Sequence, residues 1–134
     1  MQNDLGKFLL RIGVGALMIW HGIHKVLHGH DFIINQLKEN NLPTWLWYGV
    51  PIGEIVAPLL LIIGVATRLS GLVIAFTMLM SIFLVRGVNG FVINPDTGGL
   101  MAELNLLYLF SALAITFLGP GQIKLYRGKI SLLQ

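Results

Sequence analysis

The chain contains no cysteine. Without thiols it can form neither a disulfide nor a thiolate metal site. A protein that passes electrons through a pair of cysteines is therefore excluded, and any redox role has to rest on other side chains or on a partner.

Charge is also scarce. Asp, Glu, Lys and Arg make up only 11% of the 134 residues, and 55% are hydrophobic, whereas a soluble domain carries about 25% charged residues. A soluble domain of this length cannot hide so much apolar surface from water, but lipid removes the need to hide it. We therefore expect an integral membrane protein. The net charge of +3 does not indicate nucleic acid, because the basic residues lie at the ends of apolar segments.

The apolar residues form four stretches that are each long enough for a membrane-spanning helix. The predicted spans cover about residues 6–28, 45–67, 69–88 and 100–118. Gly15 and Gly22 are seven residues apart and share one face of the first span, where small residues allow a neighbouring helix to come close. The predicted fold is an all-α, four-helix membrane bundle that forms a single domain over residues 1–134.

A short amphipathic helix is predicted between the first two spans, over about residues 31–40. Phe32, Ile33, Ile34 and Leu37 fall at helical spacing, and the polar residues of this segment face elsewhere. This pattern is typical of a helix that lies at the membrane surface.

The basic residues predict the orientation. Four spans place both termini and the second-to-third connection on one side, which then carries six of the nine Lys and Arg residues. The other side carries Lys25, Lys38 and Arg86. Because the more basic side faces the cytoplasm, both termini are expected there.

Ionisable residues inside the spans each cost roughly 2.5–3.5 kcal/mol on insertion scales, so each needs a reason. At about 1.5 Å per residue, His21 lies about 10 Å and Glu54 about 13 Å below the same surface. Arg86 and Glu103 lie shallower, at roughly 3–6 Å. The formal charges balance, with Lys25 and Arg86 against Glu54 and Glu103, which favours one shared, paired cluster. Glu54 and His21 are the candidate catalytic residues, and the candidate ligand-binding residues are Lys25, Arg86, Glu103 and His24.

Other readings of these residues stay open. Arg86 and Lys25 can extend to the interface, and the same explanation serves for Arg11 near the opposite surface. His21, His24 and His28 share a helix face and can ligate a metal. Three ligands from one straight helix rarely close a tetrahedral site alone, so Glu54 or His30 would have to complete it, and the pattern does not favour metal or haem.

Three motifs together resemble the DoxX family of bacterial four-helix membrane proteins. They are LLRIGVGALMIWHGIHKV at residues 9–26, GEIVAPLLLIIGVATR at 53–68 and FLGPGQIKL at 117–125. The residues that match the family pattern are Arg11, His21, Gly22, Lys25, Glu54, Gly64, Arg68, Glu103, Gly119 and Gly121. The chain departs from the family after Gly121, where Gln122, Ile123, Lys124 and Leu125 follow.

The resemblance implies a multi-pass protein of the bacterial inner membrane, and some relatives are subunits of a thiosulfate:quinone oxidoreductase. We therefore expect a quinone-reactive subunit without a covalent cofactor, with bound quinone as ligand and a redox subunit or a second copy of the chain as partner. Two alternatives remain: a non-enzymatic binding or assembly subunit, and a proton-coupled carrier of small solutes, since buried Glu and His suit a proton relay.

Overall fold

The computed structural model describes residues 2–125, and these are almost entirely helical. The elements are α1 (Gln2–His28), α2 (His30–Glu39), η1 (Thr44–Tyr48), α3 (Gly49–Pro51), η2 (Ile52–Val56), α4 (Ala57–Ile63), α5 (Thr67–Ser81), η3 (Ile82–Arg86), η4 (Gly87–Phe91) and α6 (Glu103–Leu118). Elements η1 to α4 follow one another without a break, as do α5 to η4, so residues 2–125 form five helical rods. A single β-bridge, between Ile93 and Leu100, is the strand-like pairing within the described part.

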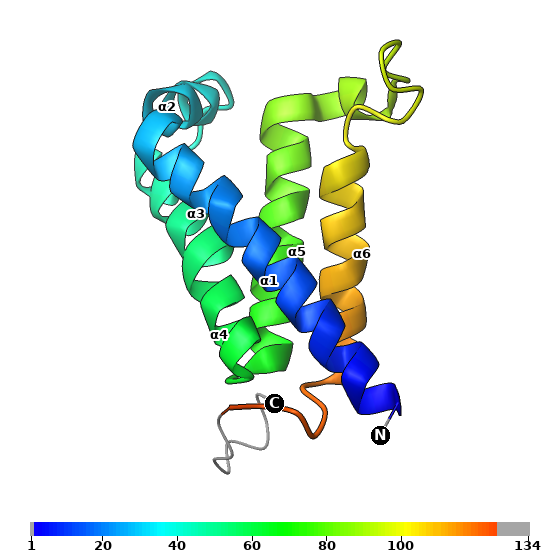
Figure 1. The fold of residues 1–134 in the computed structure, drawn as a ribbon. Coiled ribbons are helices and arrows are strands. Elements are labelled where there is room, and N and C mark those ends of the chain that lie inside the picture. Colours follow the sequence, from blue (N-terminus) through cyan, green and yellow to red (C-terminus); the bar gives the residue numbers. More distant parts are fainter. Residues whose placement is uncertain (1, 126–134) are drawn as a thin grey trace.

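The four long rods form a bundle in which α1 packs on α4, α4 on α5, α5 on α6 and α6 on α1. Figure 1 shows α1 crossing the bundle diagonally, near α6 at its start and near α2 and α3 at its end. We call the end with α2 the upper end and the end with the N-terminus the lower end. The core between the rods is apolar and includes Met18, Leu61, Ile74, Ala112 and Ile115.

Glycines on α1 let the second rod approach closely. A Cβ atom on Gly15 would lie 2.6 Å from the Ile62 Cγ1 atom, and one on Gly22 would lie 2.7 Å from the backbone oxygen of Glu54. Both distances are shorter than any van der Waals contact. The predicted glycine face of the first helix is therefore confirmed, and it holds the Glu54 backbone against α1.

Two arginines bind helix carbonyls at the lower end. Arg11, only 1% exposed, donates to the backbone oxygens of Pro120 and Ile62. Arg68 donates from Nη1 to the oxygens of Thr116 and Phe117, at 2.9 and 3.3 Å. Several of these carbonyls belong to the last turns of α4 and α6. The carbonyl groups in the last turn of a helix have no hydrogen-bond donor within that helix, and the arginines supply one.

The expectation that Arg11 extends to the membrane surface is wrong, because its guanidinium is buried against these carbonyls. A single helix shows how deep a residue lies, but it does not show which neighbouring carbonyls lack donors. The carbonyls that hold Arg11 come from segments distant in sequence, and only the packed bundle brings them together.

Two rods in the described part are long and apolar enough to cross a membrane, Thr44–Ile63 with 20 residues and Thr67–Phe91 with 25. Only 28% of the apolar stretch in each is buried within the protein. The core helix of a soluble protein would be mostly buried, so these faces need an apolar environment outside the chain. The remaining apolar helix, Glu103–Leu118, is shorter than these two rods. The helix α1 is long, but it carries the charged residues Lys7, Arg11 and Lys25 and is therefore less apolar.

The helices lie close to the predicted segments. The first begins at Gln2 rather than near residue 6, the third rod continues to Phe91, and α6 begins at Glu103. The amphipathic segment is helical over His30–Glu39, and its buried residues are Ile33 and Leu37. This face packs onto the upper end of the bundle, and a position of α2 at the membrane surface stays a prediction.

Candidate functional site at the upper end of the bundle

A cavity of about 680 Å³ occupies the upper half of the bundle, between α1, η2, α5, η3 and α6. Its walls are mainly apolar. The polar residues that line it are His21, Lys25, Gln36, Glu54, Thr77, Ser81, Arg86, Asn105 and Tyr108. An apolar chamber with a few polar side chains is the usual form of a small-molecule site, so this cavity is the candidate site.

Glu54 lies in a π-helical turn, η2, which interrupts the second rod. The amide of Ala57 bonds to the carbonyl of Ile52, five residues earlier. Pro58 has no amide proton to offer to the carbonyl of Glu54, so the regular α-helical pattern fails at this point. Single π-helical turns often occur at functional sites, because they displace one residue from the regular helix face.

Lys25 on α1 and Glu54 on η2 form an ion pair inside the cavity. The Lys25 Nζ atom lies 2.5 Å from Glu54 Oε1, and the side chains are 31% and 1% exposed. Glu54 Oε2 is also buried, yet it has no hydrogen-bond partner in the structure. Leaving a buried polar atom without a partner costs about 1–3 kcal/mol, so this oxygen is suited to bind a ligand group or to exchange a proton with it.

His21 on α1 faces Tyr108 on α6. Their ring centroids are 6.0 Å apart and the rings meet edge to face. Both line the cavity, although Tyr108 is buried and His21 is exposed. This ring contact therefore joins α1 to α6 at the cavity wall.

A second polar pair joins α6 to α5. The Asn105 side-chain amide donates to Ser81 Oγ at 3.1 Å, and both residues line the cavity. Sequence reasoning missed Asn105, Ser81 and Tyr108 because none of them carries a charge. A signal was present, since Asn105 and Tyr108 are three residues apart and so share one face of an otherwise apolar helix.

Four of the six predicted site residues line the cavity: Glu54, His21, Lys25 and Arg86. Arg86 ends the second π-helical segment, η3, and is exposed.

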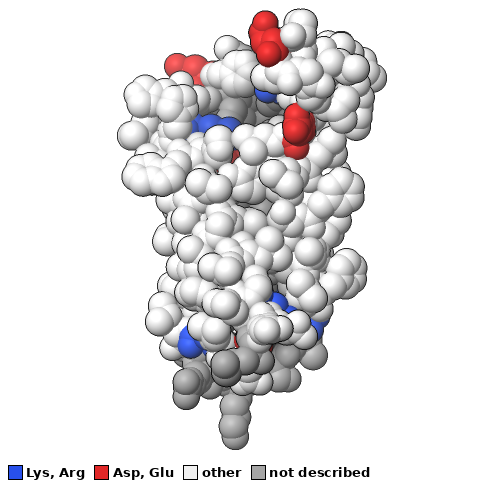
Figure 2. All heavy atoms as spheres, turned by 45° about the vertical axis from the view of Figure 1, so that its right-hand side comes forward, with Lys and Arg blue, Asp and Glu red and all other residues white. Residues whose placement is uncertain are grey.

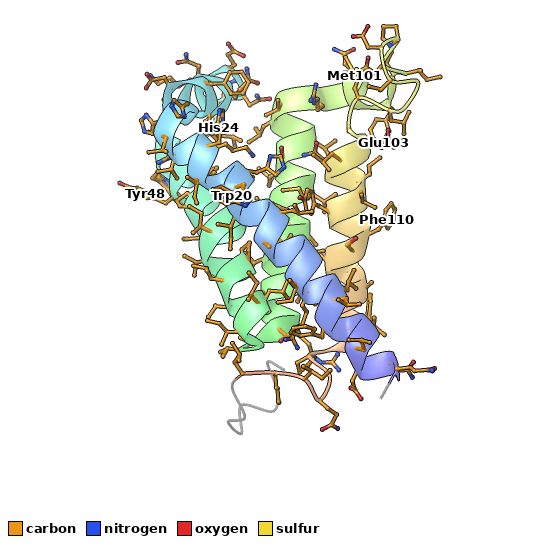
Figure 3. All side chains as sticks on the ribbon, viewed as in Figure 1. Trp20, His24, Tyr48, Met101, Glu103 and Phe110 are labelled. Atoms are coloured by element: carbon orange, nitrogen blue, oxygen red, sulfur yellow. The ribbon has the colours of Figure 1, made fainter. Side chains whose placement is uncertain are left out.

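The structure does not bring His24 and Glu103 to this cavity. The His24 ring packs on His28 with centroids 5.1 Å apart, and the Glu103 carboxylate lies against Gly99. Figure 3 shows both on the upper part of the molecule, on α1 and at the start of α6. The reason is helix rotation, since similar depth does not place two side chains on the same inner face.

Within residues 2–125, no group of three or more His, Asp or Glu side chains is placed to hold a metal ion. His24 and His28 form a pair, while His21 lies in the cavity beside Tyr108. The alternative in which His21, His24 and His28 bind a metal or haem together has no geometric support in this arrangement.

Comparison with known proteins identifies the family. The profile of the DoxX family matches residues 6–87, which is more than half of the chain, so the chain belongs to the DoxX family of membrane proteins. A protein of Bacillus subtilis (strain 168) named "Putative oxidoreductase CatD" is 27% identical over 116 residues, covering 87% of this chain and 81% of that protein. No solved structure matches the chain significantly.

The matched region runs from α1 to the end of η3. It includes the ion pair of Lys25 and Glu54, together with His21 and Arg86. The cavity wall that α6 supplies, with Asn105 and Tyr108, lies beyond it.

Proposed function

We propose that this protein is a quinone-reactive subunit of the bacterial inner membrane, which binds a quinone ring in the upper cavity and supplies protons for its reduction. The observation that carries the proposal is Glu54, a fully buried carboxylate with one oxygen paired to Lys25 and the other unpartnered beside an apolar cavity. The relative named as an oxidoreductase supports a redox role.

In the proposed arrangement all four long rods cross the membrane. The helix α1 has 27 residues and α6 has 16, and exposed apolar side chains lie along both, among them Leu9, Leu17, Leu107 and Phe110. The amide of Gln122 donates to Asp4 at 2.9 Å, so the described chain ends lie together at the lower end. The lower end also holds Lys7, Arg11 and Arg68, which favours a cytoplasmic position for it. Arg127 and Lys129, which contribute to the predicted charge bias, lie outside the described residues.

Reduction of a quinone to a hydroquinone consumes two electrons and two protons, one proton at each ring oxygen. An oxygen beside Lys25 and Glu54 would develop negative charge next to the ammonium group, which stabilises it. Once the ammonium group turns from Glu54 to this ring oxygen, the Glu54 carboxylate can take up a proton and pass it to the ring through Oε2. His21, one helical turn before Lys25 on α1 and beside Tyr108 of α6, is the second candidate donor.

The electrons must come from elsewhere. The chain has no cysteine, and its described residues offer no metal centre. We therefore assign electron delivery to a partner redox subunit or to a soluble reductant such as thiosulfate. A second copy of the chain remains a further candidate partner.

The test compares the wild type with Glu54→Gln, which keeps the shape of the side chain but cannot be ionised. We expect quinone to co-purify with the wild type and to be lost from a folded Glu54→Gln variant, as measured by mass spectrometry of extracted lipids. Glu39→Gln makes the same change on the exposed end of α2, outside the cavity lining, and as a matched control should retain quinone. Full quinone-linked turnover by Glu54→Gln would contradict the proposal.

A second candidate is a binding or assembly subunit that performs no chemistry. The absence of any thiol favours it, because such a subunit needs no electron carrier. It predicts that Glu54→Gln loses folded protein rather than turnover, which a thermal melt of the purified variant distinguishes. For a proton-coupled carrier we find no specific support.

A further inference from the structure

We propose that the ligand of the upper cavity enters sideways from the lipid, through the opening between α1 and α6, and not from the aqueous phase above the bundle. This inference rests on the proposed function, and it narrows the ligand to a molecule that is dissolved in the membrane.

The helix α2 lies over the top of the cavity. Ile33 and Leu37 are buried, at 9% and 2% exposure, and both line the cavity. A single residue, Gly29, separates this helix from α1, and the helix also contacts η3. An apolar helix face over the cavity is a barrier to water and to polar solutes, since a charged or polar molecule would lose its hydration there.

The cavity reaches the surface between α1 and α6, where the lining residues His21 and Leu104 are exposed. The two helices diverge toward the upper end (Figure 1), and each contributes lining residues: His21 and Lys25 from α1, Leu104, Asn105 and Tyr108 from α6. Leu104 is 50% exposed although it lines the cavity. In Figure 2, which shows this side of the molecule, blue atoms of basic residues lie in a recess among white atoms in the upper half.

The surface of α6 beside this opening is apolar from Leu104 onward. Leu104 and Leu107 are both well exposed on α6, at 50% and 63%, so the opening faces hydrocarbon if α6 crosses the membrane. A ligand that enters here can place a polar ring between Lys25 and Asn105 and leave an apolar tail in the lipid. A charged soluble reductant cannot take this route, so electrons would reach the ring from outside the cavity.

The experiment uses the natural absence of cysteine, which makes any introduced thiol unique. Leu104→Cys places a thiol at the opening, and Leu107→Cys places one on the same helix but outside the cavity lining. Each folded, purified variant is reconstituted in lipid nanodiscs and labelled with a bulky maleimide. The binding of a benzoquinone with an isoprenoid tail is then followed by quenching of the tryptophan fluorescence.

The label on Leu104→Cys should slow both association and dissociation of the tailed quinone by about tenfold, with the equilibrium constant unchanged, because an obstructed entrance affects both directions equally. The label on Leu107→Cys should change neither rate. Unchanged rates for labelled Leu104→Cys overturn the inference, and so does a loss of affinity without slower dissociation, which would mean that the label fills the site.

The outcome separates this inference from the proposed function. Suppose that the unlabelled protein binds quinone, that the Glu54→Gln variant does not, and that the label on Leu104→Cys leaves both rates unchanged. The quinone site is then supported and the side entrance is contradicted. If no quinone binds to the unlabelled protein, or if the Glu54→Gln variant binds it equally well, the proposed function is contradicted, and so is the entrance that depends on it.

Discussion

At the scale of single residues, the ionisable groups inside the bundle separate into two sets with different surroundings. Lys25 and Glu54 pair beside an open cavity, with one carboxylate oxygen left unpartnered. Arg11, by contrast, is enclosed and bonded to backbone carbonyls of two distant segments. An unpartnered atom next to free volume can bind a ligand, whereas an enclosed guanidinium among carbonyls stabilises the fold.

Arg11 provides a test at this scale. We expect Arg11→Lys to destabilise the protein by about 1–3 kcal/mol, because a single ammonium group cannot serve the carbonyls of both Pro120 and Ile62 and leaves one without a donor. The measurement is thermal unfolding of the purified protein in detergent. The exposed Lys38→Arg is the control and should leave the melting temperature unchanged. An equally stable Arg11→Lys would restore the interpretation in which this side chain extends to the membrane surface.

At the scale of elements, the position of Glu54 depends on how closely the second rod approaches α1. Gly22 permits the contact with the Glu54 backbone, and the π-helical turn η2 sets the direction of its side chain. A second π-helical turn, η3, ends at Arg86 on the other wall. Each of these irregular turns shifts side chains around the helix axis. Residues that a regular helix would direct elsewhere therefore face the cavity.

Two glycines of the same helix test this packing. Gly22→Ala places a methyl group 2.7 Å from the Glu54 carbonyl oxygen, so the helices must separate, at a cost of about 1–3 kcal/mol. Gly13→Ala meets nothing within 4 Å and should raise stability by about 0.5–1 kcal/mol through helix propensity. Thermal unfolding of both variants checks the pair. Equal effects at the two positions would show that α1 does not pack on η2 in this way.

At the scale of the whole molecule, the bundle has two ends with different roles. The lower end is closed by Arg11, Arg68 and the Gly119–Pro120–Gly121 turn, and a Cβ atom on Gly119 would lie 3.2 Å from the Arg68 guanidinium. The upper end contains the cavity and is covered by α2. This division places the proposed chemistry near the membrane surface opposite the chain ends.

The proposed orientation predicts which end is accessible from outside the cell. Asn35 on α2 and Gln2 at the start of α1 are both exposed, and each can carry the only thiol of the chain. We expect Asn35→Cys to react with a membrane-impermeant maleimide in intact cells, and Gln2→Cys to react only after the membrane is made permeable. The reverse pattern would place the cavity on the cytoplasmic side and contradict the positive-inside argument.

Much of this protein follows from the sequence alone. The scarcity of charge and the four apolar stretches predict a helical membrane protein, and the motifs around Arg11, His21 and Glu54 are sufficient to indicate its family. Ionisable residues inside apolar segments also mark Glu54, Lys25, His21 and Arg86, because each such group needs a stabilising environment.

The tertiary structure alone decided which of these residues meet. In the folded chain Lys25 pairs with Glu54, while His24 and Glu103 lie outside the cavity. The cavity walls also include uncharged residues, Asn105, Ser81 and Tyr108. The physical reason is that spacing along one helix determines the depth of a residue and its face on that helix. The rotation of that face toward a neighbouring helix depends on side-chain packing between segments far apart in sequence, and no single segment contains that information.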